Sequence, residues 1–139
     1  SKWYYDWGEL HKKDGTAYFT EKGAFRNHPC TQWAAESLFN TAWLIQHGCA
    51  LVDEYKYRYG KIHGCAKTLT EAKIMFHMCA SEVTTCYCMV KSFTRAMPDE
   101  WKYDKNIDTI TAYKRYINSK PWVKDNYLRK PERKPSWIK

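Results

Sequence analysis

The pattern of apolar and polar positions predicts one long helix in the first half of the chain. Pro29 suits the first helical turn because its φ angle is already helical, and Gly60 suits the position just past the last turn. From Trp33 to Val52, apolar residues recur nearly all the way round the helix. Such a pattern is typical of a helix that is mostly buried. We therefore expect this helix to form the centre of the fold.

Polar residues interrupt this apolar run. Ser37 and Asn40 fall on the same helical stripe as Trp33 and Leu44. A buried polar group needs a hydrogen-bond partner, and leaving Asn40 unpaired would cost about 1–3 kcal/mol. We expect Asn40 to have a partner, either in the protein or in a ligand.

A second helix is predicted by the sequence Thr68-Leu69-Thr70-Glu71, which has the spacing of a capping box. The helix would run from Thr68 to about Ser81, with Ile74, Met75 and Met78 facing the core.

The sequence of the second half of the chain predicts shorter helices. A third helix is expected from Ile107 to Asn118, capped by Asp104 or Asn106 and stopped by Pro121. One more short helix can follow from Trp122 to Leu128. The predicted fold class is mainly α, with one long central buried helix, two or three shorter helices and extended connectors.

Length and composition predict a single domain over residues 1–139, with a basic, aromatic-rich C-terminal segment at 102–139. Aromatic content of 17% argues against disorder. No apolar run is long enough to span a membrane, and no signal peptide opens the chain. We expect an intracellular, cytoplasmic protein, in the host cytoplasm if it is viral, with mostly reduced cysteines.

Charge is unevenly distributed. The net charge is +8, and residues 102–139 hold eleven Lys or Arg against four acidic residues. A one-sided basic segment points to a polyanion, and aromatic residues interleave with the charges, so nucleic acid is the expected partner. Lys114, Arg115 and Lys124 are the predicted contacts in this segment. The alternative is a solvated basic tail.

The end of the long helix concentrates titratable groups. Glu54 is a candidate general acid or base, and Arg58, Lys61 and His63 are candidate phosphate contacts. The alternative is structural: cations are favoured at a helix C-terminus, and Glu54 and Arg58 have the spacing of a helical ion pair.

The start of the long helix offers a second candidate site. A helix N-terminus attracts anions, and Arg26 and His28 stand beside it as candidate phosphate contacts, although a simple cap and turn would explain them equally well. A helix of this length holds its ends roughly 40 Å apart. One pocket lined by both ends therefore requires the chain to fold back.

The sequence indicates neither a metal nor another cofactor. His63-x-Cys65, His77-x-Cys79 and Cys86-x-Cys88 recur, but zinc sites ordinarily use different spacings. A P-loop, a dinucleotide-binding glycine pattern and a Gly-x-Ser-x-Gly elbow are all missing.

Several motifs resemble a family of small phage and bacterial proteins associated with pyrimidine dimer DNA glycosylases of the phage endonuclease V type. The motifs are Asn27-His28-Pro29-Cys30, Trp33, Glu36-Ser37, Asn40, Trp43-Leu44, Glu54-Tyr55-x-Tyr57-Arg58-Tyr59-Gly60-Lys61-x-His63, Ala96-Met97-Pro98-Asp99-Glu100, Asp108, Ala112-Tyr113-Lys114-Arg115-Tyr116 and the final Pro-Ser-Trp. Glycosylases of that type use the N-terminal amine as nucleophile, with a helical glutamate beside it. The resemblance implies Glu54 as that carboxylate. It assigns no residue of this chain as the nucleophile.

The resemblance implies a DNA base-excision N-glycosylase/lyase that acts on damaged or modified pyrimidines. Stacking on Trp33 or Tyr59 would offset the cost of extruding a base. The alternatives are a non-catalytic nucleic-acid-binding module and a nucleotide-processing enzyme. DNA is favoured over RNA as the partner, no membrane is involved, and the oligomeric state stays open.

Overall fold

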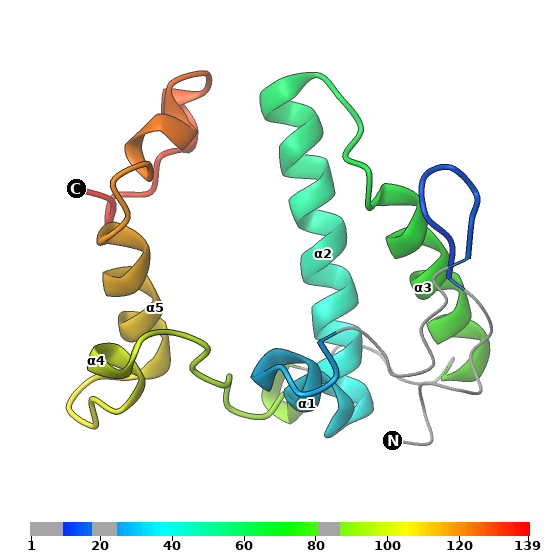
Figure 1. Cartoon of the computed structure of the whole chain (residues 1–139), viewed down its shortest axis with the longest axis horizontal. Coiled ribbons are helices and arrows are strands. Elements are labelled where there is room, and N and C mark those ends of the chain that lie inside the picture. The colour runs from blue at the N-terminus through cyan, green and yellow to red at the C-terminus, as the bar shows by residue number, and fades with distance from the viewer. Residues whose placement is uncertain (1–9, 18–24, 81–86) are drawn as a thin grey trace. The chain divides into compact units, whose positions relative to one another are not determined.

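The structure is a computed structural model that describes residues 10–17, 25–80 and 87–139. The chain divides into two compact units, unit 1 (Ser1–Lys91) and unit 2 (Ser92–Lys139), and each is described by itself. Both are built from helices (Figure 1), which confirms the expected mainly α fold. The single-domain organisation stays a prediction.

The helices follow one another without an intervening sheet in the part of the chain that the structure describes. Unit 1 contains α1 (Pro29–Ala35), α2 (Leu38–Tyr59), α3 (Ala66–Cys79) and the 3-10 helix η2 (Tyr87–Met89). Unit 2 contains α4 (Asp99–Lys102), α5 (Thr109–Asn118) and the 3-10 helices η3 (Lys124–Tyr127) and η4 (Pro131–Arg133).

The prediction of one continuous long helix is wrong, because the helix is interrupted between α1 and α2. Ser37 has extended backbone angles, with φ −157° and ψ 154°, and its side chain accepts a hydrogen bond from the Asn40 N–H at 3.1 Å. The Glu36 N–H donates to the Trp33 carbonyl at 3.2 Å and closes α1. Serine is a preferred N-cap, so Ser37 starts a new helix.

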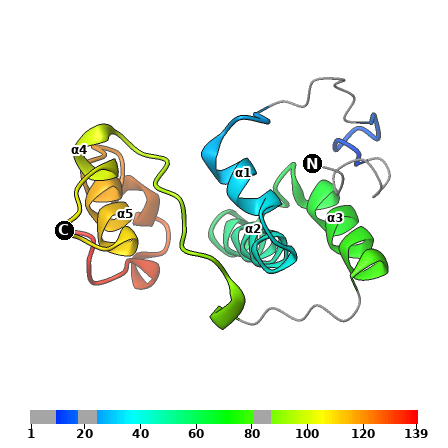
Figure 2. The same ribbon diagram turned by 90° about the horizontal axis from the view of Figure 1, so that it is seen from below.

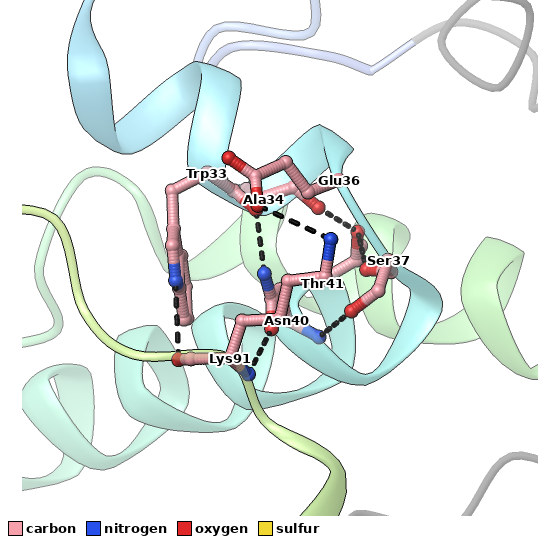
Figure 3. Close-up of polar contacts among 7 residues, drawn as sticks. All are labelled: Trp33, Ala34, Glu36, Ser37, Asn40, Thr41 and Lys91. Carbon is pink, nitrogen blue, oxygen red and sulfur yellow. Dashed lines mark hydrogen bonds and ion pairs between the residues drawn. The ribbon is translucent and has the colours of Figure 1, made fainter.

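Asn40 has the partners that its burial demands (Figure 3), and they are protein groups. It is 0% exposed. Its Nδ2 donates to the Trp33 carbonyl at 2.7 Å, and its Oδ1 accepts from the Lys91 N–H at 3.0 Å. The Trp33 indole N–H in turn donates to the Lys91 carbonyl at 3.3 Å. One side chain therefore joins α1, α2 and the segment that follows η2.

The core of unit 1 lies between α2 and α3. Buried Ala42, Phe76 and Ala80 form it, and Leu38 and Ile45 pack against them. Figure 2 looks along α2 and shows α1 and α3 against different sides of that helix.

The expectation that most of the long helix is buried is wrong, because Asn40 and Ala42 are the residues of α2 that are buried. Leu44 and Leu51 of α2 are 38% and 56% exposed. Among the described residues, α1, α3 and η2 contact α2, and they leave these apolar positions outside the core. In α3, likewise, Ile74 and Met78 are exposed although we expected them in the core, and Phe76 is buried instead.

The predicted capping box of α3 is also wrong. The helix begins at Ala66, so Thr68 and Glu71 lie inside it. Their side chains instead bind the backbone of His11: the Thr68 hydroxyl donates to its carbonyl at 2.7 Å, and a Glu71 carboxylate oxygen accepts its N–H, also at 2.7 Å. The same i, i+3 spacing that resembles a cap therefore attaches an N-terminal segment to α3.

In unit 2, Arg95 organises the loop that precedes α5. Its guanidinium donates to the carbonyls of Trp101 at 3.0 Å, Asp104 at 2.6 Å and Ile107, and to the Thr109 hydroxyl at 3.3 Å. Four acceptors on one side chain give this irregular segment a defined shape.

The cap of α5 is Asp108, and not Asp104 or Asn106 as we expected. Its carboxylate accepts from the Thr111 N–H at 2.9 Å and from the Thr111 hydroxyl at 2.6 Å. These hydrogen bonds, with the side-chain bond the larger cause, hold the pKa of Asp108 below its ordinary value.

We predict that Asn40→Ala lowers the free energy of unfolding by about 2–4 kcal/mol, because it removes the acceptor of the Lys91 N–H and one of the two donors to the Trp33 carbonyl. Denaturant unfolding followed by circular dichroism measures this. Gln46→Ala, at an exposed position of the same helix, serves as the control and should change stability by about 0.5 kcal/mol or less. Equal stabilities of the two variants would mean that the Asn40 bonds contribute nothing.

We also predict a pH dependence from Asp108. Its pKa is lower in the folded state than in the unfolded state, so its stabilisation is complete above the unfolded pKa of about 4 and is lost as pH falls through the folded pKa. Asp108→Asn keeps a good cap without the charge. The stability advantage of the natural protein over Asp108→Asn should therefore shrink as pH falls below about 4. An advantage that does not change with pH would contradict this assignment.

Candidate functional site

The end of α2 carries the first group of candidate residues. Gly60 closes the helix as predicted: its φ is +64°, and its N–H donates to the Lys56 carbonyl at 2.8 Å. We call Glu54, Tyr55, Arg58, Tyr59 and His63 the α2 C-terminal cluster.

Glu54 and Arg58 form an ion pair in this cluster. The Arg58 Nε lies 2.7 Å from a Glu54 carboxylate oxygen. The Glu54 side chain is 21% exposed and that of Arg58 is 17% exposed, so the pair is more shielded from water than ordinary surface pairs, which contribute about 0–1 kcal/mol.

Aromatic rings stand beside the ion pair. The Tyr55 ring lies 4.7 Å from that of Tyr59, in a tilted arrangement, and 4.9 Å edge-on from the imidazole of His63. The Nδ1 of His63 accepts the Cys65 N–H at 3.2 Å. In the neutral ring the hydrogen is therefore on Nε2, and it is available to an acceptor such as a phosphate.

The start of α1 carries the second group, Arg26 and His28. His28 is the N-cap of α1, and its Nδ1 accepts the Cys30 N–H at 3.2 Å. Arg26 is exposed. The cap proposed for His28 is thus confirmed, while phosphate binding by these two residues stays a prediction.

The two groups do not meet. Figure 1 shows α1 at the start of α2, whereas the cluster is at its other end. At about 1.5 Å per residue, α2 spans roughly 33 Å. A single pocket lined by His28 and by Arg58 to His63 is therefore excluded, because α2 holds them apart. Lys61, which is exposed, stays with the cluster.

The structure also changes the role of Trp33. This residue is 5% exposed, and its indole N–H is bonded to the Lys91 carbonyl. Because the ring is buried, Trp33 cannot stack on an extruded base. Tyr59 is partly exposed and remains a candidate for this role.

The basic residues predicted in the C-terminal segment are exposed in unit 2. Lys114 and Arg115 lie on α5, and Lys124 begins η3. The Lys114 ammonium lies 5.9 Å from the centre of the Trp137 ring, a weak cation–π contact.

The end of the chain is folded and does not form a loose tail. The Asn118 side chain of α5 donates to the Trp137 carbonyl at 2.7 Å and accepts the Lys139 N–H at 3.2 Å. Ile138, between them, is 4% exposed. A packed end argues against the solvated-tail alternative.

The contact between His11 and α3 was not predicted from the sequence. His11 lies beside α3, with its Nδ1 3.2 Å from the Glu71 carboxylate, although 60 positions separate the two residues in the chain. No local pattern signals such a contact. The i, i+3 spacing of Thr68 and Glu71 was the only hint, because it places both on one helix face.

Possible metal ligands are scattered over the part of the chain that the structure describes. In residues 10–17, 25–80 and 87–139, no three His, Cys, Asp or Glu side chains form a group that could bind a metal ion. The thiols of Cys30, Cys49, Cys65 and Cys79 are free, whereas Cys88 is disulfide-bonded. None of the helices described there is both long and apolar enough to cross a bilayer.

Comparison with known proteins gives a partial match. Residues 7–67, somewhat less than half of the chain, match the model of a family described as pyrimidine dimer DNA glycosylase. No curated protein and no solved structure matches significantly. The match includes α1, α2, Arg26, His28 and the α2 C-terminal cluster, and it ends before unit 2. Residues 7–67 are therefore similar to the pyrimidine dimer DNA glycosylases, which confirms the association indicated by the sequence motifs.

Proposed function

We propose that this protein is a DNA base-excision N-glycosylase, with associated lyase activity, that acts on damaged or modified pyrimidines. The observation that carries the proposal is the family match over residues 7–67, because it covers the segment that holds the shielded Glu54–Arg58 pair.

Glu54 is the proposed catalytic carboxylate. When an N-glycosidic bond breaks, its electrons leave with the base and positive charge develops on the sugar. A fixed carboxylate stabilises that charge. The Arg58 Nε, 2.7 Å from this carboxylate, holds it in place, and Glu54 would stabilise the developing oxocarbenium or shuttle protons. The lyase step needs an amine nucleophile in addition, and we assign none.

The surrounding basic residues are the proposed phosphate contacts. Lys61 and His63 would bind phosphate near the end of α2, and Arg26 and His28 would do so near the start of α1. The two groups lie at opposite ends of the α1–α2 region, so the proposal assigns them separate phosphate contacts and no shared pocket.

The test is turnover of an ultraviolet-irradiated duplex and of an abasic duplex, with borohydride trapping of any Schiff base. We predict that Glu54→Gln lowers the rate by about 10²–10⁴-fold while DNA binding persists, because the variant removes the charge and the acceptor of a proton.

Asp53→Asn is the matched control, since Asp53 is the exposed neighbour of Glu54. It should leave the rate unchanged. Unimpaired turnover by a well-folded Glu54→Gln protein would remove Glu54 from the mechanism. Absence of any cleavage or trapped adduct with the natural protein would contradict the glycosylase proposal itself.

A non-catalytic role in nucleic-acid binding is the second candidate function, and the charge of unit 2 favours it. Residues 102–139 carry eleven basic and four acidic residues, and Lys114, Arg115 and Lys124 are exposed there. Exposed lysine and arginine side chains neutralise phosphates and release counterions. This function can coexist with catalysis by unit 1.

We predict that the triple variant Lys114→Ala, Arg115→Ala, Lys124→Ala binds duplex DNA more weakly. Its log–log salt dependence should be flatter by about 0.9 for each lost phosphate contact. Fluorescence anisotropy over a salt series measures both quantities. The charge-retaining variant Lys114→Arg, Arg115→Lys, Lys124→Arg is the control. If the alanine variant keeps the natural affinity and slope, these residues do not contact nucleic acid.

A further inference from the structure

The part of α2 that leads to Glu54 exposes two leucine side chains. Leu51 is 56% exposed and Leu44 is 38% exposed. Leu51 precedes Glu54 by three positions and Arg58 by seven, and both spacings place side chains on the same side of a helix. Because α2 runs without a break through all these positions, the helix itself fixes where Leu51 stands relative to the ion pair.

Helix α3 covers the neighbouring side of α2. The side chain of Leu69 lies so close to Gly48 that a Cβ added to this glycine would be 2.7 Å from it. Positions three apart in sequence differ by about 60° around a helix, so Gly48, Leu51 and Glu54 lie at successive steps away from this contact. Leu51 therefore stands between the side of α2 that α3 covers and the carboxylate proposed for the chemistry.

An exposed leucine beside that carboxylate has a use in base excision. The target base must leave the base stack before its bond to the sugar can be reached. Proteins that open a base step insert apolar side chains such as leucine into it. Such a side chain needs no hydrogen-bond partner inside the stack and leaves water on entering it.

The aromatic candidates near Glu54 do not fill this role. Trp33 is buried, and Tyr59 is the candidate for stacking on the extruded base itself. The space that the base vacates needs a different side chain, and Leu51 is exposed one helical turn from the carboxylate. A helix also holds this side chain in place before DNA binds, so little ordering is needed on binding.

We propose that Leu51 enters the base stack beside the target pyrimidine and keeps its base out of the duplex. The inference rests on the proposed function in taking Glu54 as the carboxylate that meets the sugar. Residues three apart on a helix have Cβ atoms about 5–6 Å apart, so Leu51 and Glu54 can reach the same nucleotide. Leu44 precedes Glu54 by ten positions, about 15 Å along the helix, and is too far away to do so. Leu51 is thus a positioning residue, because it acts on the stack and not on the bond that breaks.

The first test measures unstacking without cleavage. An irradiated duplex carries 2-aminopurine beside the damaged pyrimidines, and this base analogue fluoresces more strongly when it is unstacked. The full natural chain at saturating concentration should raise the fluorescence, and Leu51→Ala should raise it at most about half as much. Leu51→Met keeps a long apolar side chain and should restore the signal. An equal rise with Leu51→Ala would overturn the proposal.

The second test measures cleavage of two forms of the same irradiated strand. Leu51→Ala should cleave the fully paired duplex about tenfold or more slowly than the natural protein. It should cleave at the natural rate when the bases opposite the damage are mismatched, because an unpaired base is easier to extrude. An equal loss on both substrates would mean that Leu51 only supports the structure of the site, and it would overturn the proposal.

Leu44→Ala is the matched control, since it removes the other exposed leucine of α2. It should leave the fluorescence and both cleavage rates unchanged. The melting temperatures of the two alanine variants should stay close to that of the natural protein, because both side chains are exposed. Equal losses of activity in the two variants would overturn a specific role of Leu51.

The two proposals can fail separately. The fluorescence test requires binding alone, so it decides the role of Leu51 even if the natural protein does not cleave. Unstacking that depends on Leu51, without any cleavage, would support the insertion and overturn the glycosylase. Cleavage by the natural protein, with natural rates in Leu51→Ala, would overturn the insertion alone.

Discussion

The fold of unit 1 depends on the cost of burying an amide. Asn40 is fully enclosed, and an enclosed amide must both donate and accept. It donates to the last part of α1 and accepts from Lys91, which is 51 positions away in the chain. The buried indole of Trp33 donates to the carbonyl of the same lysine. Since no apolar residue can replace these bonds, one short polar side chain decides how three segments of the chain are joined. Among the described residues, the buried apolar cluster of this unit consists of Ala42, Phe76 and Ala80.

Features with a local cause could be predicted from the sequence. Pro29 and Gly60 mark the true limits of the α1–α2 region, because both residues act through their own backbone angles. The Glu54–Arg58 contact likewise follows from helical spacing. The break at Ser37 was missed since a serine in an apolar run reads equally well as an interior residue. The role of Thr68 and Glu71 could not be predicted, because their partner, His11, is far away in the sequence. The sequence also could not show whether the two groups of candidate residues form one pocket. The length of the helix can be predicted from local sequence, but a return of the chain that would bring its two ends together cannot.

Positive charge is presented in both units, on different local structure. At the end of α2 it accompanies the glycine cap, and in unit 2 it lies on α5 and η3. The carboxylate proposed for chemistry is separate from the excess charge, since Glu54 is already matched by Arg58. In the proposed function, the basic groups of unit 1 would contact phosphates and Glu54 would act on the sugar.

Both ends of the segment that forms unit 2 are tied to the same ten-residue helix. Near its start, the Tyr113 hydroxyl donates to the Thr94 carbonyl at 2.8 Å and accepts from the Ala96 N–H at 3.1 Å. At its other end, the Asn118 amide holds Trp137 and Lys139. Helix α5 therefore contacts both the 94–96 stretch and the 137–139 stretch of unit 2 through side chains of its own. A substitution that unwinds α5 should thus release both stretches together, although they lie some forty positions apart in the chain.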